Sequence, residues 1–240
     1  MALWISDPTH LQIYADALHS VMTGQPAVEK TFGVRVFEYF PRNPELSEVF
    51  NNAMTNFSAF VVPAALEAYD FSGVDSIVDV AGGHGQVLMS ILKRYPQMTG
   101  VLFDLDHVIA GAGPRILESG LDGRIRTESG DFFKAVPAGA DAYVMKHIIH
   151  DWDDEKARAI LRSIRAAMKP SGRVVLLESV LTPSNQPDFG KLLDLEMMLL
   201  PGGRERSEAE FRRLFASAGF ELTRIVPTSS PLSVIEAKQA

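Results

Sequence analysis

SIVDVAGGHGQVLMSILKRY, residues 76–95, combines an apolar run, three glycines and an amphipathic pattern in direct succession. The first six residues are rich in valine and isoleucine, which favour strands. Apolar residues in 86–95 recur at the spacing of one helix face. A strand that passes through glycines straight into a helix predicts a tight turn whose backbone a ligand can approach closely.

The chain continues this alternation toward its C-terminus. Further strand-like runs lie at 99–104, 124–129, 141–146 and 172–179, and helical patterns between them lie at 107–119 and 153–169. Such βα repetition predicts an α/β fold with a doubly wound, mostly parallel sheet. After a helix at 208–219, two strand-like runs at 221–228 and 231–238 complete seven strands and need not follow the βαβ rule.

The first 70 residues differ from the rest. Helical patterns at 11–24 and 44–69 are separated by breaks at Gly33, Pro41 and Pro44. We therefore predict a helical extension over residues 1–70 and a ligand-binding domain over 71–240.

Composition narrows the class of protein. The 240 residues are 46% hydrophobic, carry a net charge of −7 and include no cysteine. The longest apolar runs, such as 174–177 and 197–200, are far shorter than the roughly 20 residues of a membrane-spanning helix. The negative net charge argues against binding to nucleic acid. A soluble, cytoplasmic protein without disulfides, membrane contact or nucleic-acid partner is expected.

Two acids accompany the glycine turn. Asp104 ends the next strand, about 20 residues beyond the glycines. At this position an acid can accept hydrogen bonds from the two ribose hydroxyls. Asp131 follows the third strand. A dinucleotide fingerprint that starts at Gly83 meets Leu88 at its third glycine, which disfavours NAD. The turn could also lack a ligand, and Asp131 could be a turn or N-cap aspartate. The combination favours an adenosine-containing ligand.

Five motifs carry a specific resemblance: VDVAGGHG (78–85), FDLDHVI (103–109), GDFF (130–133), KHIIHDWDDE (146–155) and PGGRERSEAEF (201–211). In this order they resemble the motifs of class I S-adenosylmethionine (SAM)-dependent O-methyltransferases of the caffeic-acid and bacterial natural-product type, which are Rossmann-like. The resemblance implies SAM as cofactor, bound by Gly82, Gly83, Gly85, Asp104, Asp131, Phe132 and Lys146. Ala81 and Asp106 stand where the family has a glycine and a proline, so we expect a SAM site that is altered but not lost.

The resemblance also implies the catalytic residues. A hydroxyl that attacks a methyl donor must lose a proton, which a neutral histidine can accept. His150 is the implied general base, and Glu178 and Glu205 are its implied carboxylate partners. Glu178 gains support from its place at the end of an apolar strand. His147 is expected to be a bystander, and we predict no metal, although His147 and His150 with nearby acids could supply ligands.

The acceptor is expected to be a small phenolic or polyketide-like hydroxylated metabolite. Phe50, Met54, Met197 and Met198 occupy positions that line the acceptor pocket in the family, and they could equally belong to the core. Family members carry an N-terminal dimerisation domain before the part seen here, so a homodimer is doubtful and residues 11–24 would expose an apolar face. A SAM-binding tailoring hydroxylase or decarboxylase, or a non-catalytic SAM-binding protein, remains an alternative.

Overall fold

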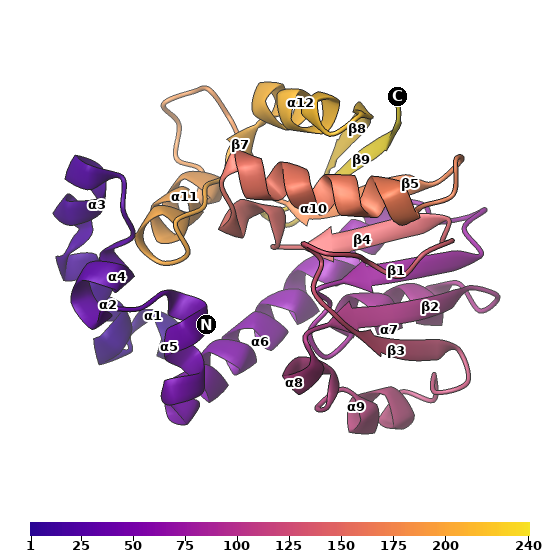
Figure 1. The fold of residues 1–240 in the computed structure, drawn as a ribbon, viewed down its shortest axis with the longest axis horizontal. Helices are drawn as coiled ribbons and strands as arrows, with labels where there is room; N and C mark the ends of the chain where they lie inside the picture. Colours follow the sequence, from indigo (N-terminus) through magenta and orange to yellow (C-terminus); the bar gives the residue numbers. More distant parts are fainter.

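The computed structural model describes residues 1–240 and is built around a seven-stranded sheet (Figure 1). Its strand order is β3-β2-β1-β4-β5-β9-β8. The strands are β1 (Ser76–Val80), β2 (Thr99–Asp104), β3 (Ile125–Ser129), β4 (Ala142–Lys146), β5 (Arg173–Glu178), β8 (Phe220–Pro227) and β9 (Ser233–Gln239). The first five pair in parallel, and β9 runs antiparallel to both β5 and β8. The predicted doubly wound, mostly parallel sheet is confirmed.

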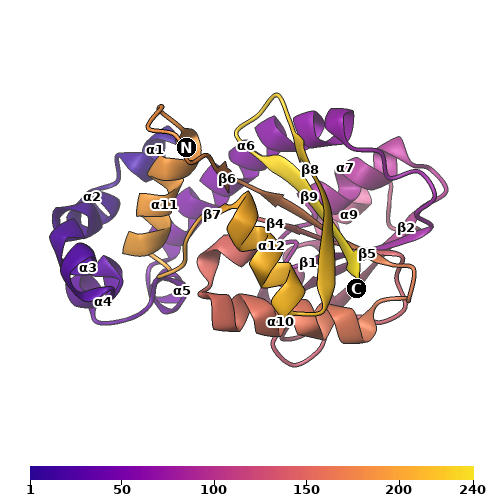
Figure 2. The same cartoon turned by 90° about the horizontal axis from the view of Figure 1, so that it is seen from above.

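Helices cover both faces of this sheet (Figure 2). On one face lie α6 (Pro44–Ala68), α7 (Gln86–Arg94) and α9 (Gly113–Glu118), and on the other lie α10 (Asp154–Ala167) and α12 (Glu208–Ser217). The apolar stripe predicted within 86–95 is the reason α7 docks: Leu88 and Leu92 are fully buried. Burial of one such side chain contributes about 1.5–3 kcal/mol.

The N-terminal helices form a separate cluster with α11 (Phe189–Leu199), at the side of the sheet (Figure 1). They are α1 (Ala2–Ile5), α2 (Pro8–Ala15), α3 (Ala17–Thr23), α4 (Ala27–Phe32), α5 (Val36–Tyr39) and the 3₁₀ turn η1 (Phe40–Arg42). One carboxylate joins them to α11: Glu196 accepts hydrogen bonds from Trp4, from His10 at 2.9 Å and from Tyr14 at 2.6 Å. The proposed division of the chain at residue 70 stays a prediction.

Three expectations about helices were wrong in detail. The pattern at 107–119 forms two short helices, α8 (Asp106–Ile109) and α9, and the pattern at 11–24 divides into α2 and α3. No helix was expected where α11 lies. The face of α3 carries exposed Leu18, Val21 and Met22, as the pattern indicated. None of the helices combines the length and apolar character of a membrane-spanning segment.

Candidate active site

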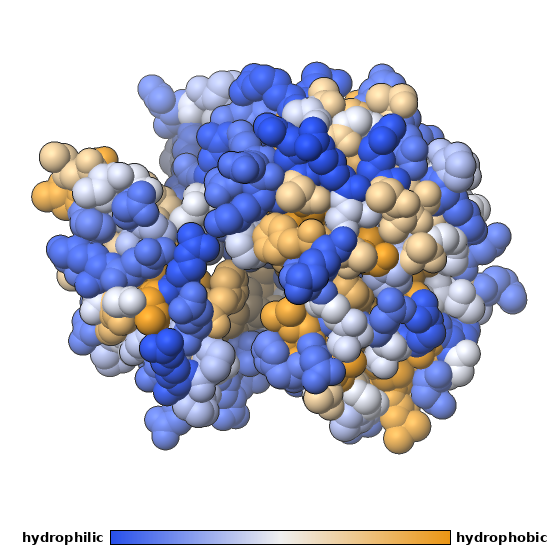
Figure 3. Space-filling view, viewed as in Figure 1, coloured by the Kyte–Doolittle hydropathy of each residue, from blue (hydrophilic) through white to orange (hydrophobic).

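The predicted site residues gather at the carboxyl ends of the parallel strands. Asp104, Lys146 and Glu178 are the last residues of β2, β4 and β5, and the glycine turn follows β1. Figure 3 shows a hollow between the N-terminal helices and the rest of the molecule, with apolar side chains at its rim. This edge is where open α/β sheets bind ligands. A cavity of about 500 Å³ near the opposite strand ends, lined by Ser76 and Thr99, is therefore remote from the site.

The glycine turn passes so close to β1 and β2 at Gly82 that no side chain fits at this position. A Cβ at Gly82 would lie 2.5 Å from Cγ of Asp79 and 2.6 Å from a methyl of Leu102. Gly83 and Gly85 have φ angles of 59° and 83°, in the left-handed region that glycine adopts at little cost. The turn can therefore bring bare backbone N–H groups against a ligand.

Ala81 departs from the family glycine, and the structure gives this departure a physical meaning. Its φ angle is 56°, which also lies in the left-handed region. An L-residue pays about 1–2 kcal/mol for this conformation. Alanine at this position therefore carries a backbone cost that glycine would not.

Asp104 links the glycine turn to the second strand. Its carboxylate accepts hydrogen bonds from the N–H of Gly83 at 2.8 Å and of Leu105 at 2.7 Å. A carboxylate has about four lone-pair positions, so two remain for hydroxyl donors. Burial raises the pKa of Asp104, and the two N–H groups partly offset this rise. The group is held in place and can accept from a ribose.

The other predicted cofactor residues lie around this edge in different environments. Asp131 accepts a hydrogen bond from the N–H of Phe133 at 2.9 Å, which is the turn role that the sequence left open. Phe132 packs edge-on against Phe133 and Trp152. Lys146 is held among acids, but burial lowers its pKa. All three residues therefore lie at the same edge of the sheet as the glycine turn, and their roles in cofactor binding stay predictions.

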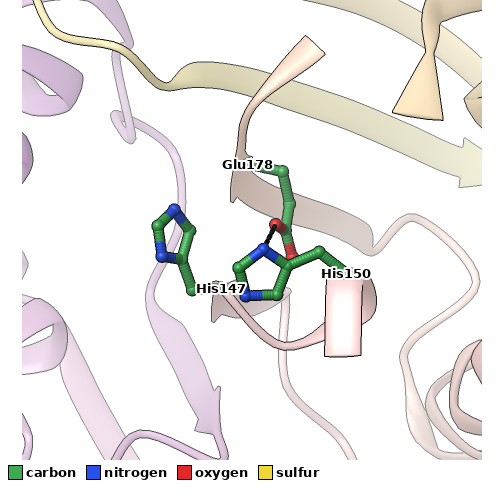
Figure 4. Close-up of side chains that lie close together, drawn as sticks. All are labelled: His147, His150 and Glu178. Atoms are coloured by element: carbon green, nitrogen blue, oxygen red, sulfur yellow. Dashed lines mark ion pairs between the residues drawn. The ribbon is translucent and has the colours of Figure 1, made fainter. Parts of the chain in front are cut away.

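His150 lies in the 3₁₀ turn η2 (Ile149–Asp151) and meets both predicted carboxylates. Its Nδ1 is 2.6 Å from Oε1 of Glu205. The same Nδ1 is 3.7 Å from Oε2 of Glu178 (Figure 4). Only 4% of His150 is exposed. A proton on Nδ1, shared with Glu205, leaves Nε2 with a free lone pair, 3.5 Å from Oδ1 of Asp151. This is the geometry of a base with an orienting acid.

Burial makes ionisation of the two carboxyl groups unfavourable unless a positive charge lies beside them. Burial raises the pKa of Glu205 to about 8, and burial also raises the pKa of Glu178. Oε1 of Glu178 accepts hydrogen bonds from the N–H groups of Ile148 and Ile149, whereas Oε2 of each glutamate is buried without a partner. An imidazolium formed at His150 would therefore be stabilised by groups already in position.

The motif GGRER holds the loop that carries His150. A Cβ at Gly203 would lie 1.9 Å from the carbonyl oxygen of His150, so only glycine permits this approach. Arg206 is fully buried and donates hydrogen bonds to the carbonyl oxygens of Ile149 at 3.0 Å and Trp152 at 2.8 Å. We expected no role for Arg206 from the sequence, because the charges in residues 204–213 alternate in sign, as is typical of a solvated helix face.

The metal alternative can be compared with these contacts. His147, His150 and Glu178 offer ligand atoms within 4.8 Å of one another. Both Nδ1 of His150 and Oε1 of Glu178 are already engaged in hydrogen bonds. The expectation of no metal stays a prediction.

The four expected acceptor residues lie on α6 and α11. Phe50, Met54 and Met198 pack against the apolar cluster of the N-terminal helices, and Met197 is buried. Phe50 stacks on Phe40 with ring centroids 4.6 Å apart. Such contacts are those of core residues, which is the alternative that the sequence left open. A role of these four residues in acceptor binding stays a prediction.

A second cavity lies between α6 and the glycine turn. It measures about 420 Å³, and its lining includes Asn51 and Asn52 of α6, His84 of the glycine turn and Arg115 of α9. The N-terminal helix α6 thus forms one wall of the space beside the turn.

Comparisons with known proteins agree with this geometry. A family model described as an O-methyltransferase domain matches residues 14–221. Phenazine O-methyltransferase PhzM of Lysobacter antibioticus is 44% identical over 94% of this chain and 66% of its own length. O-demethylpuromycin-O-methyltransferase of Streptomyces alboniger is 39% identical over 91% of this chain and 60% of its own length. The chain thus spans slightly less than two thirds of these relatives.

The solved structure of the mitomycin 7-O-methyltransferase MmcR superimposes with a TM-score of 0.94 and 33% identity, over 100% of this chain and 70% of that one. The chain belongs to the O-methyltransferase family.

Proposed function

We propose that the protein is a SAM-dependent O-methyltransferase that methylates a hydroxyl of a small aromatic or polyketide-like metabolite. The observation that carries the proposal is the contact of His150 Nδ1 with Glu205 at 2.6 Å, at the strand edge that also holds the glycine turn. The names of the relatives support the reaction class, since they describe methyltransferases acting on phenazine and O-demethylpuromycin. A tailoring hydroxylase or decarboxylase gains no such support.

The chain's residues fit SAM, which supplies an electrophilic methyl group when bound. The glycine turn leaves room for close backbone approach, and Asp104 keeps lone pairs for the ribose hydroxyls. Phe132 is the proposed border of the adenine, with Asp131 and Lys146 beside it. The roles of all these residues are proposals.

His150 carries the proton chemistry in this proposal. With Nδ1–H donated to Glu205, Nε2 would accept the proton of the acceptor's hydroxyl group, and SAM would supply the methyl group and leave as S-adenosylhomocysteine. Glu205 and Glu178 stabilise the resulting imidazolium. Holding the two reactants in line supplies much of the remaining acceleration. Phe50, Met54, Met197 and Met198 are the proposed walls around the acceptor.

Methyl-labelled SAM tests the function directly. We expect label transfer to members of a panel of phenols and naphthols.

An Asp104→Ala variant should bind SAM about 10- to 100-fold more weakly than wild type, because hydrogen bonds to a charged group contribute about 1.5–3 kcal/mol. Calorimetry measures the binding. Asp122→Ala, which removes an exposed acid near the opposite strand ends, is the matched control. SAM binding without transfer to any acceptor would favour a non-catalytic SAM-binding protein.

Replacing Glu205 with glutamine tests the orienting carboxylate. Because the pKa of Glu205 is raised to about 8, its ionised form, which accepts from Nδ1–H, gains population as the pH rises through that value. We expect wild-type kcat/KM to rise there. Glu205→Gln cannot ionise and should lose about tenfold in kcat, a loss smaller than removal of the base because Glu178 remains nearby.

The measurement is the ratio of wild-type to variant kcat/KM at each pH, which cancels ionisation of the acceptor. A ratio independent of pH between 6 and 9.5 would contradict the role of this carboxylate.

Association and location are further parts of the proposal. The homodimer that the family resemblance implies would draw on apolar faces such as that of Leu18, Val21 and Met22. A cytoplasmic location rests on the cysteine-free composition.

A further inference from the structure

His147 was expected to be a bystander, yet it lies directly against the proposed base. The ring centroids of His147 and His150 are 4.5 Å apart, and their planes differ by 38° (Figure 4). The φ angle of His147 is 54°, so this side chain is presented from a left-handed backbone. Its N–H donates to the carbonyl oxygen of Leu177, which fixes the backbone against β5. Such strain costs about 1–3 kcal/mol and persists where the surroundings impose it, often at functional sites.

The imidazole of His147 has hydrogen-bonding capacity that the protein leaves unused. Its Nε2 is buried and has no hydrogen-bond partner. An unpaired buried polar atom costs about 1–3 kcal/mol. Burial holds the pKa of His147 well below its usual range, and the positive charges of His150 and Lys146 add to this effect. The ring is therefore neutral at physiological pH, with one N–H donor and one bare acceptor nitrogen.

The other neighbours of His147 belong to the helices proposed to enclose the acceptor. Phe57 of α6 lies 5.2 Å from its ring, and Phe57 in turn stacks on Phe189 of α11 at 6.1 Å. His147 thus stands between the base and an aromatic wall made by two helices. An aromatic acceptor that presents its hydroxyl to His150 would bring the neighbouring ring position close to His147.

We propose that His147 is a specificity-determining residue that binds a polar substituent adjacent to the reacting hydroxyl. The inference rests on the proposed function and names its substrate class: aromatic acceptors with a hydroxyl, amine or carboxylate on the neighbouring carbon. Two such heteroatoms lie about 3 Å apart, so each can meet one of two imidazoles whose centroids are 4.5 Å apart, within ordinary hydrogen-bond distances of about 2.7–3.2 Å. An isolated phenol engages His150 alone.

The test compares 2,3-dihydroxynaphthalene with 2-naphthol, which lacks only the neighbouring hydroxyl. Binding of each is measured by calorimetry in the presence of S-adenosylhomocysteine, and kcat and KM are measured with SAM. His147→Phe keeps an aromatic ring beside Phe57 and removes both nitrogens, whereas His147→Asn retains hydrogen bonding and tolerates the left-handed backbone. Thermal melting checks that each variant is folded.

We expect His147→Phe to weaken binding of the dihydroxy compound about tenfold, mainly through KM, and that of 2-naphthol by at most about threefold. His147→Asn should recover part of the difference. Equal losses for both ligands, or no loss for either, would overturn the inference. Selective binding without methyl transfer would support His147's role while contradicting the proposed function, so the two failures are distinguishable.

Discussion

His150→Ala is expected to lower kcat about 10²–10⁴-fold, the contribution of a positioned general base. The side chain is almost fully buried, and the contact of its Nδ1 with Glu205 at 2.6 Å fixes the orientation of the ring. SAM affinity should stay close to wild type, because the residue lies outside the glycine turn. Label transfer at saturating SAM and acceptor measures kcat, and calorimetry measures SAM binding.

His19→Ala provides the matched control for this variant, since His19 lies on α3, away from the strand edge. A second readout separates loss of a base from loss of structure. Phenols ionise near pH 10, so an acceptor that is already deprotonated no longer needs the base. The deficit of His150→Ala should therefore shrink as the pH rises toward 10. A deficit that stays constant with pH would contradict the assignment of His150 as base.

Local sequence patterns predicted the central strands well because β1, β4 and β5 are short apolar runs that are almost entirely buried. Asp104 and Glu178 show this, since each was expected at a strand end and each ends a strand. The same reasoning missed α11, whose apolar residues do not form one stripe: Leu192 and Leu195 are exposed, whereas Met197 and Leu199 are buried. Without a one-sided pattern, no helix could be recognised.

The site was predictable only as far as motifs and strand ends reach. The resemblance selected His150 and Glu205, but 55 residues separate them, and no local rule gives the 2.6 Å contact between them. His147 was expected to be a bystander, and its left-handed backbone cannot be recognised from the sequence. Arg206 was overlooked because a charged residue is seldom buried unless it is paired, and its partners are distant in the sequence.

Arg206→Ala is the second change with a large expected effect, this time on stability. The guanidinium donates to two carbonyl oxygens of the loop that carries His150 and also contacts Oδ1 of Asp154 at 2.9 Å. Its side chain is 1% exposed and that of Asp154 is 47% exposed. Removing one partner of a buried ion pair costs about 3–5 kcal/mol, and the partly solvated aspartate places our expectation near the lower end, about 3 kcal/mol.

Arg204 offers a control on the same carboxylate. It donates to Oδ2 of Asp154 at 2.6 Å but is 44% exposed, so Arg204→Ala should cost at most about 1 kcal/mol. Urea unfolding followed by tryptophan fluorescence compares the two variants, with Trp152 as a reporter inside the loop. Arg206→Lys keeps the charge but cannot reproduce the fork of donors, so its stability should lie between those of wild type and Arg206→Ala. If Arg206→Ala were no less stable than Arg204→Ala, the loop would depend on Glu178 and Gly203 alone for its position, and Arg206 would not anchor the base.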